Sequence, residues 1–434
     1  MKQKKASARF WWALVIFGLT GQVAWVVENM YFNVFLYQMF HASAESISAM
    51  VAASAISATV TTLLIGALSD KLGRRKAFIC GGYILWGLSI AAFALVRMDY
   101  LSAWFPAVSA AALGITLTII LDCIMTFFGS SANDAAFNAW LTDSTDHSNR
   151  GAAEGVNAMM PLVAILVVFG GFMSFDLTQA SSWTTIFLLI GGVVIAIGVL
   201  GIFLIKEKAV RIPENNHYFR NIIYGFRPSV MKANPTLYAV LVAFAVFGIS
   251  IQIFMPYLIL YYQVSLQMEN YVLIMAPAIV LASVATAFYG RLYDRFGFAR
   301  SVMPALLLLM LGYAFLYLCR GTALVFIGSL LMMTGYLAGM AVFGAMLRDY
   351  TPDNKAGMFQ GLRIVAQVLI PGVIGPAIGA AVLKNAETIV NSDGTTSFIP
   401  NANIFLVAGI AAVLVWLWLP VVLRCKKGEE SIES

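Results

Sequence analysis

The sequence contains twelve runs of mostly apolar residues, each about 20 residues or longer, and this feature restricts the fold more than any other. A run of that length crosses the hydrocarbon core of a bilayer as an α-helix, whereas the strands of a membrane barrel would alternate polar and apolar residues. Hydrophobic residues make up 61% of the chain, more than the interior of a soluble domain requires. We therefore predict an all-α membrane protein with twelve transmembrane helices, at about 10–39, 45–69, 77–96, 107–140, 152–175, 182–205, 234–262, 270–289, 301–319, 323–347, 358–383 and 402–423.

Lysine and arginine are distributed unequally among the predicted loops. When the N-terminus is placed inside, the outer loops hold only Arg97, Arg320 and Lys384, while Arg363 lies within a span. Positively charged loops stay on the cytoplasmic side, so we predict a multi-pass protein of the cell membrane with both termini cytoplasmic. The short loops favour a bacterial inner membrane. The net charge of +6 follows this topological rule, and we do not expect nucleic-acid binding.

Two internal matches indicate that the chain is built from two related halves. The segment Gly66–Lys76 recurs in degraded form at Gly290–Arg300, 224 residues later, and Asp143 recurs as Asp349. We predict an N-terminal six-helix bundle at 1–205, a central cytoplasmic loop at 206–233, and a C-terminal six-helix bundle with a cytoplasmic tail at 234–434. Halves related in parallel place a substrate site between them, near the middle of the bilayer.

The repeated segment reads Gly-Ala-Leu-Ser-Asp-Lys-Leu-Gly-Arg-Arg-Lys in its first copy. Its glycines allow a tight turn, and its aspartate can pair with a cation or cap a helix. The segment resembles the loop between the second and third helices of the major facilitator superfamily. The resemblance implies two pseudo-symmetric six-helix bundles that work by alternating access. We expect charge pairs between the halves to hold an inward gate, which involves Gly66, Asp70, Gly73, Arg74, Asp294 and Arg300.

Ionisable side chains inside a span are costly and suggest function, and Glu28 is the clearest case. At 100° per residue, one arc of about 140° on the first span holds Gln22, Trp25, Glu28, Asn29, Phe32 and Asn33. Such a stripe suits a sugar, because amides and a carboxylate bind hydroxyl groups and aromatic rings cover the apolar face of the ring. Hydrogen bonds that merely join helices are the alternative, and they account poorly for the carboxylate.

The fourth span adds Asp122, Asn133, Asp134 and Asn138. Asp122 and Asn133 are eleven positions apart and share a face. Asp122 is either a carrier of a coupling proton or a structural residue at a solvated outer mouth. Asp134 lies about 9 Å from the inner end of the span, so a gate or an inter-helix bond is an alternative to proton coupling or substrate contact.

The second half contributes fewer candidates. Arg363 is the basic residue deep enough to need a partner, unless it extends to the inner surface. Tyr257 near the end of span seven is a candidate substrate contact, whereas an interfacial aromatic belt better explains Tyr261 and Tyr262. We expect the Pro- and Gly-rich segment 371–379 to kink span eleven and to pack closely.

The run Ala24–Asn29 and the run Asp134–Asp143 together resemble the sucrose-transporter branch of the glycoside–cation symporters. The resemblance implies a proton-coupled importer of sucrose, maltose or related glycosides. Asn138 stands where that branch has an arginine, which puts this contact in doubt. Ala58 and Thr62 stand where melibiose-permease relatives have sodium-site aspartates, so we expect protons rather than sodium.

These observations predict a secondary transporter that imports a sugar or small glycoside by proton symport. Glu28, Asp122 and Asp134 are the coupling candidates, and the proposed substrate-binding residues are Gln22, Trp25, Asn29, Asn33, Asn133, Asn138, Tyr257 and Arg363. A proton-coupled exporter of amphipathic drugs is the alternative, although its pocket would be more apolar. A sugar sensor that does not transport is a second alternative, but sensors carry long cytoplasmic domains.

No serine–histidine or cysteine–histidine arrangement and no nucleotide loop is apparent, so we do not expect an enzyme. We also expect no cofactor, no metal and no disulfide among Cys80, Cys123, Cys319 and Cys425. The first apolar run is too long for a cleavable signal peptide and reads as the first span. The expected partners are the lipid bilayer and the solute, with a monomer as the functional unit.

Overall fold

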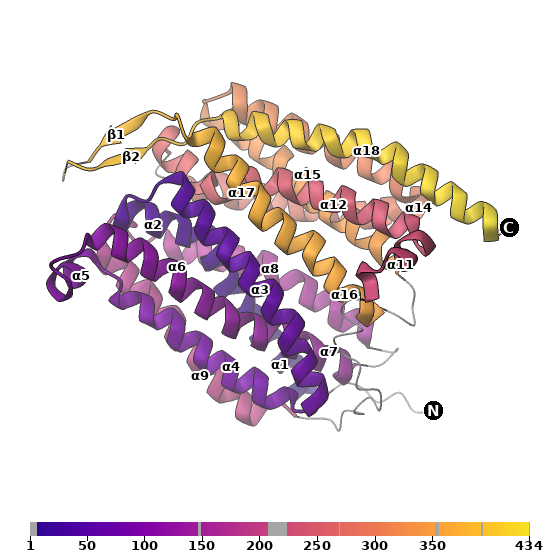
Figure 1. Cartoon of the computed structure of the whole chain (residues 1–434), viewed down its shortest axis with the longest axis horizontal. Helices are drawn as coiled ribbons and strands as arrows, with labels where there is room; N and C mark the ends of the chain where they lie inside the picture. The colour runs from indigo at the N-terminus through magenta and orange to yellow at the C-terminus, as the bar shows by residue number, and fades with distance from the viewer. Residues whose placement is uncertain are drawn as a thin grey trace. The chain divides into compact units, whose positions relative to one another are not determined.

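Long apolar helices make up almost all of the computed structural model, which describes residues 7–145, 149–206, 224–268, 270–351, 356–391 and 394–433 (Figure 1). The chain forms two units, Met1–Asn216 and His217–Ser434. Twelve helical runs within the described residues are long and apolar enough to cross a membrane, six in each unit. The prediction of an all-α fold with twelve spans is therefore confirmed.

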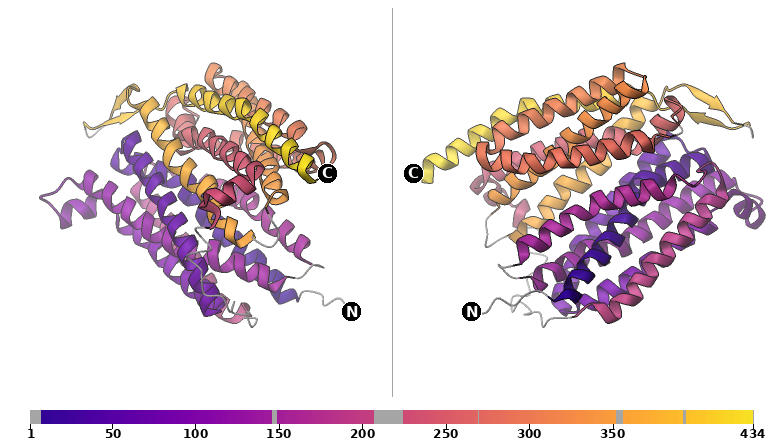
Figure 2. Two further views of the ribbon diagram at one scale, coloured as in Figure 1. Left: turned by 45° about the vertical axis from the view of Figure 1, so that its right-hand side comes forward. Right: turned by 180° about the vertical axis from the view of Figure 1, so that it is seen from behind.

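The helices of the N-terminal unit run alongside one another, as Figure 2 shows. A π-helical segment, η1 (Val27–Tyr31), joins the first two helices into one span, and a second, η3 (Ser130–Phe137), lies within the fourth span. A 3₁₀ turn, η2 (Phe93–Leu95), ends the third span. The α-helices of this unit are α1 (Ala8–Val26), α2 (Phe32–Phe40), α3 (Ala44–Leu72), α4 (Arg75–Ala92), α5 (Met98–Trp104), α6 (Ala110–Gly129), α7 (Asn138–Ser144), α8 (Arg150–Phe172) and α9 (Ala180–Leu204).

The C-terminal unit has two further π-helical segments, η6 (Tyr261–Ser265) and η8 (Val365–Leu369), and two 3₁₀ turns, η4 (Tyr224–Phe226) and η5 (Met255–Tyr257). Its α-helices are α11 (Pro228–Ala233), α12 (Pro235–Phe254), α13 (Leu258–Leu260), α14 (Val272–Leu318), α15 (Thr322–Asp349), α16 (Ala356–Ile364), α17 (Ile370–Leu383) and α18 (Asn403–Glu433). A hairpin of β1 (Thr388–Val390) and β2 (Thr396–Phe398) precedes the last helix; its strands are antiparallel, with Thr388 opposite Phe398.

The two copies of the repeated segment both turn at a glycine. In the first copy Gly73 adopts a left-handed φ of 62° and ends α3, and α4 begins two residues later. In the second copy Gly297 has a φ of 73° and non-helical backbone angles, so α14 consists of two helices that meet at a kink there. Glycine alone adopts such angles without strain, so both copies bend at the same motif position. The ninth span therefore begins near Arg291, earlier than the predicted residue 301.

Aromatic rings fill the interior of each unit. In the N-terminal unit Phe35 lies 5.2 Å from Trp183 and 5.0 Å from Phe187, measured between ring centroids. In the C-terminal unit Tyr261 and Tyr262 are almost completely buried. The prediction of an interfacial aromatic belt at these two tyrosines is therefore wrong, since their rings pack inside the bundle.

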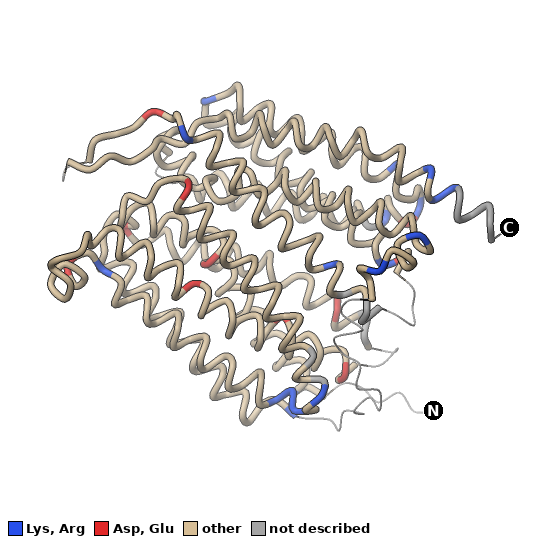
Figure 3. The backbone as a smooth tube through the Cα atoms, viewed as in Figure 1, with Lys and Arg blue, Asp and Glu red and all other residues tan. Residues whose placement is uncertain are grey.

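Large apolar side chains are exposed along the helices, such as Leu188 and Leu189 on α9 and Leu281 and Phe288 on α14. In a soluble protein this surface would be an interaction site, but on a membrane-spanning helix it faces lipid. Figure 3 shows that, within the N-terminal unit, Lys and Arg gather at the end that holds the first repeated segment. We call this the basic end.

Candidate functional site

Glu28 lies inside the N-terminal unit, with only 6% of its surface exposed. It sits in the π-helical segment η1, and hydroxyl groups from two other spans reach its side chain. Ser54 on α3 donates to Glu28 Oε1 at 2.7 Å, and Thr126 on α6 donates to the same oxygen at 2.9 Å. The two hydroxyl oxygens are themselves 2.9 Å apart. Three spans therefore meet at one carboxylate oxygen.

Asp122 lies one helical turn before Thr126 on α6 and is 1% exposed. Neither of its carboxyl oxygens has a hydrogen-bond partner among the described residues, and the same holds for Glu28 Oε2. The alternative of a solvated outer mouth does not describe this buried position. Glu28 thus accepts from two hydroxyls on neighbouring spans, and a second buried carboxyl group, that of Asp122, lies one turn from Thr126 on α6. Ionisable groups enclosed within spans in this way suggest function.

A second polar cluster surrounds Asn133 in η3. The Tyr83 hydroxyl lies 2.8 Å from the carbonyl oxygen of Phe17 and 3.1 Å from Asn133 Oδ1, so α1, α4 and η3 meet here. Gly21 makes this approach possible, because a Cβ atom on it would stand 2.6 Å from Asn133 Oδ1. Asp134 accepts a hydrogen bond of 3.0 Å from Ser130, one turn earlier in the same segment.

Trp25 stacks at a tilt on Trp86, with ring centroids 5.1 Å apart. The indole nitrogens of both rings are buried without a hydrogen-bond partner among the described residues. Gly129 leaves space for them, since a Cβ atom there would lie 2.7 Å from the Trp86 ring. The tryptophan pair thus offers two unused donors close to the cluster around Asn133.

The polar stripe predicted on the first span is broken in the structure. Asn29 is exposed and donates to the carbonyl of Trp25 at 2.8 Å, whereas Asn33 is buried and donates to the carbonyl of Asn29 at 3.1 Å. The reason is η1, whose wider turn shifts every later residue around the helix axis. Gln22 and Trp25 stay half-buried ahead of this turn, and Phe32 turns into the core.

Of the remaining substrate candidates, one lies in the N-terminal unit and two lie in the C-terminal unit. Asn138 is exposed and donates to the carbonyl of Asp134 in its own helix at 3.1 Å. Tyr257 is completely buried, and its hydroxyl donates to the carbonyl of Pro376 at 3.3 Å. Arg363 is half-buried on α16. Of the predicted set, the structure thus brings together Trp25, Asn133 and Asp134, with Glu28 nearby on the same span as Trp25.

Arg75 forms the clearest ion pair at the basic end. Its Nε lies 3.2 Å from Asp143 Oδ2 on α7, and its Nη1 donates to Ser69 Oγ on α3 at 2.5 Å. Its neighbour Arg74, which we predicted as a gate residue, is exposed. Asp294 and Arg300 are exposed as well, and the side chain of Asp70 lies outside what the structure describes. The gate between the halves stays a prediction.

Ser54 and Thr126 are site residues that the sequence did not predict. Hydroxyl residues are common in transmembrane helices, where most of them bond to their own backbone. The available signal was depth, because both residues lie near the middle of predicted spans, as Glu28 does. Depth alone does not select these two from the other serines and threonines of the same spans.

Known proteins resemble this chain over most of its length. Residues 10–340 match the model of the Major Facilitator Superfamily. Among solved structures, the nucleoside transporter NupG is 12% identical with a TM-score of 0.68, and the match covers 94% of this chain and 98% of that one. A bacterial homologue of the human lysosomal transporter Spinster, in an inward-facing and occupied conformation, is 15% identical (TM-score 0.69, 98% of each chain). The xylose transporter XylE from E. coli is 15% identical (TM-score 0.67, 95% and 99%). No curated protein matches the sequence.

Proposed function

We propose, from the premise that this chain belongs to the major facilitator superfamily, that it imports a sugar or small glycoside together with a proton. Membership of this family makes the chain a membrane transporter rather than an enzyme. The observation that carries the proposal is the enclosed carboxyl group of Glu28 and its two hydroxyl partners.

The coupling proton is assigned to Glu28 on the grounds of hydrogen-bond counting. Ser54 and Thr126 both donate to Glu28 Oε1, whereas Glu28 Oε2 has no hydrogen-bond partner among the described residues. A proton can therefore bind to Glu28 Oε2 without breaking either of these hydrogen bonds. Asp122, which has no partner for either oxygen among the described residues, is the second group that can take up a proton.

The solute class rests on the chemistry near this carboxyl group. The indole donors of Trp25 and Trp86, the amide of Asn133 and the carboxyl of Asp134 suit a ring with several hydroxyl groups. The names of two similar structures, a nucleoside transporter and a xylose transporter, refer to solutes that contain a sugar. Sucrose and maltose are the first candidates, from the runs at Ala24–Asn29 and Asp134–Asp143.

The orientation follows the charges. Placing the basic end of the N-terminal unit in the cytoplasm puts both termini in the cytoplasm and the protein in the cell membrane. With an inward proton gradient, solute and proton then enter together. In an exporter of amphipathic compounds, protons would also flow inward, but the solute would move outward.

The test is the external pH of de-energised cells that express the protein, during addition of sugars and nucleosides one at a time. We expect alkalinisation with at least one solute, because uptake carries protons inward. Alkalinisation that also occurs in cells expressing Glu28→Gln would remove Glu28 from the mechanism. Silence with every solute at normal surface expression, in the presence and in the absence of sodium, would contradict the symport proposal and favour export.

A further inference from the structure

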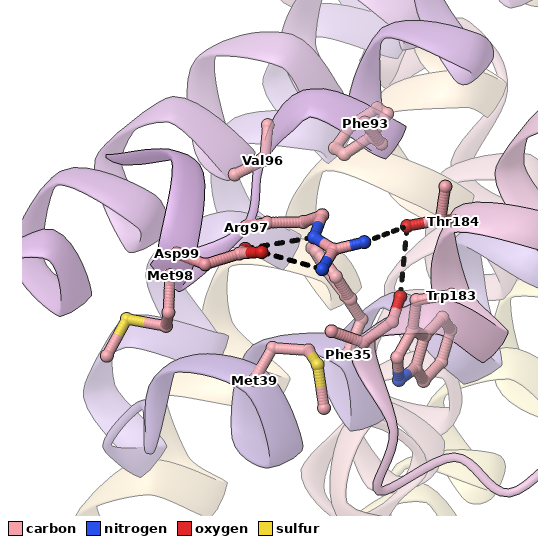
Figure 4. Close-up of a pocket in the computed structure, with 10 residues that line it drawn as sticks. Phe35, Met39, Phe93, Val96, Arg97, Met98, Asp99, Trp183 and Thr184 are labelled. Atoms are coloured by element: carbon pink, nitrogen blue, oxygen red, sulfur yellow. Dashed lines mark hydrogen bonds and ion pairs between the residues drawn. The ribbon is translucent and has the colours of Figure 1, made fainter. Parts of the chain in front are cut away.

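A pocket of about 200 Å³ opens at the end of the N-terminal unit that lies opposite the basic end (Figure 4). Its walls are apolar and largely aromatic, and they come from α2, from η2 and from the start of α9. The apolar wall residues are Phe35, Met39, Phe93, Val96, Met98, Ala180 and Trp183. The charged groups of the transport site proposed above are not among the lining residues.

Arg97 and Asp99 form a salt bridge in the wall of this pocket. Arg97 Nε donates to Asp99 Oδ1 at 2.9 Å and Arg97 Nη2 donates to Asp99 Oδ2 at 2.7 Å, while Nη1 donates to Thr184 Oγ1 at 3.3 Å. The guanidinium group also lies 4.7 Å from the centre of the Tyr100 ring. An arginine has five N–H donors, so two remain for a ligand, and the Asp99 side chain is 56% exposed.

The position of the pocket along the spans shows which layer of the membrane it faces. The first and third spans end at Phe40 and Leu95, and the sixth begins at Ala180, all beside the pocket. Exposed leucines on α4 and α9, among them Leu88 and Leu188, continue down the spans below it. The pocket therefore lies where hydrocarbon gives way to headgroups, continuous with the lipid-facing surface.

The neighbouring helix α5 has the composition of an interfacial segment. Tyr100 and Trp104 stack with ring centroids 5.6 Å apart, and both are exposed, as is Phe105. Tryptophan and tyrosine favour the headgroup level of a membrane, where the ring is in apolar surroundings and its polar atom stays wet. This places α5 on the membrane surface beside the pocket.

We propose that the pocket binds the headgroup of a phospholipid with a primary amine, such as phosphatidylethanolamine. The Arg97–Asp99 pair is neutral overall, so Asp99 repels a simple anion and Arg97 repels a simple cation. A zwitterion satisfies both, because its phosphate accepts from the two remaining N–H groups of Arg97 while its ammonium donates to Asp99. The apolar walls take the first part of an acyl chain. The proposal is independent of the solute and of proton coupling.

The test is native mass spectrometry of the purified, delipidated protein, with phosphatidylethanolamine, phosphatidylcholine and phosphatidylglycerol that carry identical acyl chains. We expect the ethanolamine lipid to be retained about tenfold more than either of the others, since the choline ammonium cannot donate and the glycerol headgroup has no ammonium. Equal retention of all three lipids would overturn the proposal.

Three variants locate the effect. Asp99→Asn should abolish the preference for ethanolamine over choline, and Arg97→Gln should reduce retention of all three lipids. The matched control is Arg320→Gln, because among the described residues Arg320 bonds only to backbone carbonyls, those of Leu316, Tyr317 and Cys319, and this change should have no effect. If Arg97→Gln does not fold, Asp99→Asn decides alone. Retention that is unchanged in both pocket variants would overturn the assignment, as would complete displacement of the lipid by soluble ethanolamine phosphate at equal concentration.

Discussion

The two units bury different polar chemistry in similar helical frameworks. The N-terminal unit encloses the carboxyl groups of Glu28 and Asp122, whereas no charged side chain is buried among the described residues of the C-terminal unit. That unit buries phenols instead: the Tyr313 hydroxyl lies 3.1 Å from Ser250 Oγ, and the Tyr262 hydroxyl lies 2.5 Å from Ser329 Oγ. Phenols hold helices together without exchanging protons near neutral pH, and carboxyl groups can do both. The comparison supports the proposal that proton chemistry belongs to the N-terminal unit, while the C-terminal unit is a neutral framework.

The largest expected effect separates these two roles. Glu28→Gln keeps the size of the side chain but cannot release a proton, so proton-driven accumulation should fall to background while solute exchange continues. Tyr313→Phe should retain most transport and lose about 1 kcal/mol of stability, the usual net contribution of one hydrogen bond. Accumulation and exchange of labelled solute in proteoliposomes measure both. Equal loss of accumulation in the two variants would break the comparison.

Close packing should be common to both units. A Cβ atom on Gly87 would stand 2.5 Å from the carbonyl oxygen of Gly191, and one on Gly312 would stand 2.3 Å from the backbone nitrogen of Met332. Gly87→Ala and Gly312→Ala should therefore each destabilise by about 1–3 kcal/mol, because the backbone must move. Unfolding in detergent provides the measurement. The controls are Gly192→Ala and Gly344→Ala, where a Cβ atom meets nothing within 4 Å; a similar loss in the controls would show that helix packing is not the cause.

The two copies of the repeated segment also differ in the side-chain hydrogen bonds that they make. In the first copy Arg75 joins Ser69 to Asp143, whereas in the second copy the Tyr293 hydroxyl donates directly to Asp349, the counterpart of Asp143. Arg75→Gln should cost about 1–3 kcal/mol, as for a charged hydrogen bond, and Tyr293→Phe about 1 kcal/mol. Thermal unfolding of the two variants compares them directly. A larger loss in Tyr293→Phe would mean that the second copy is not the weaker of the two.

The smallest expected effect is a pH dependence of the stability, which arises from Asp99 at the end of the N-terminal unit opposite the basic end. Hydrogen bonds from Arg97 hold the pKa of the Asp99 carboxyl below its usual range. Asp99 therefore stabilises the fold above pH of about 4, its pKa in an unfolded chain, and this contribution is lost as the pH falls through the lower folded value. For so exposed a pair the gain is at most about 1 kcal/mol. Asp99→Asn should remove this acid sensitivity, whereas Arg320→Gln should leave it unchanged, since backbone carbonyls do not titrate. Unfolding curves from pH 7 downwards, to about pH 3, provide the check.

The length and composition of the apolar runs were enough to predict twelve spans, because a bilayer admits few other solutions. The cost of burying a charge was likewise enough to single out Glu28 and Asp122. The partners of Glu28 could not be predicted, since Ser54 and Thr126 look like many other hydroxyl residues in the spans. The different exposure of Asn29 and Asn33 could not be predicted either, because η1 adds a residue to one turn and no sequence pattern marks that insertion. The hairpin β1–β2 had no signal strong enough to separate it from a loop.

The π-helical segments have a mechanical consequence. Each is a dislocation in the helical lattice, a place where one turn holds one residue too many, and such segments lie within the first, fourth, seventh and eleventh spans. A dislocation can migrate along its helix by exchanging one hydrogen bond for the next, and neither end of the helix has to move. Each step rotates the residues that it passes, so a shift of η1 would turn Glu28 away from Ser54 and Thr126. A shift of the π-helical segment can thus bring the Glu28 carboxyl group into different surroundings while the rest of the first span stays in place.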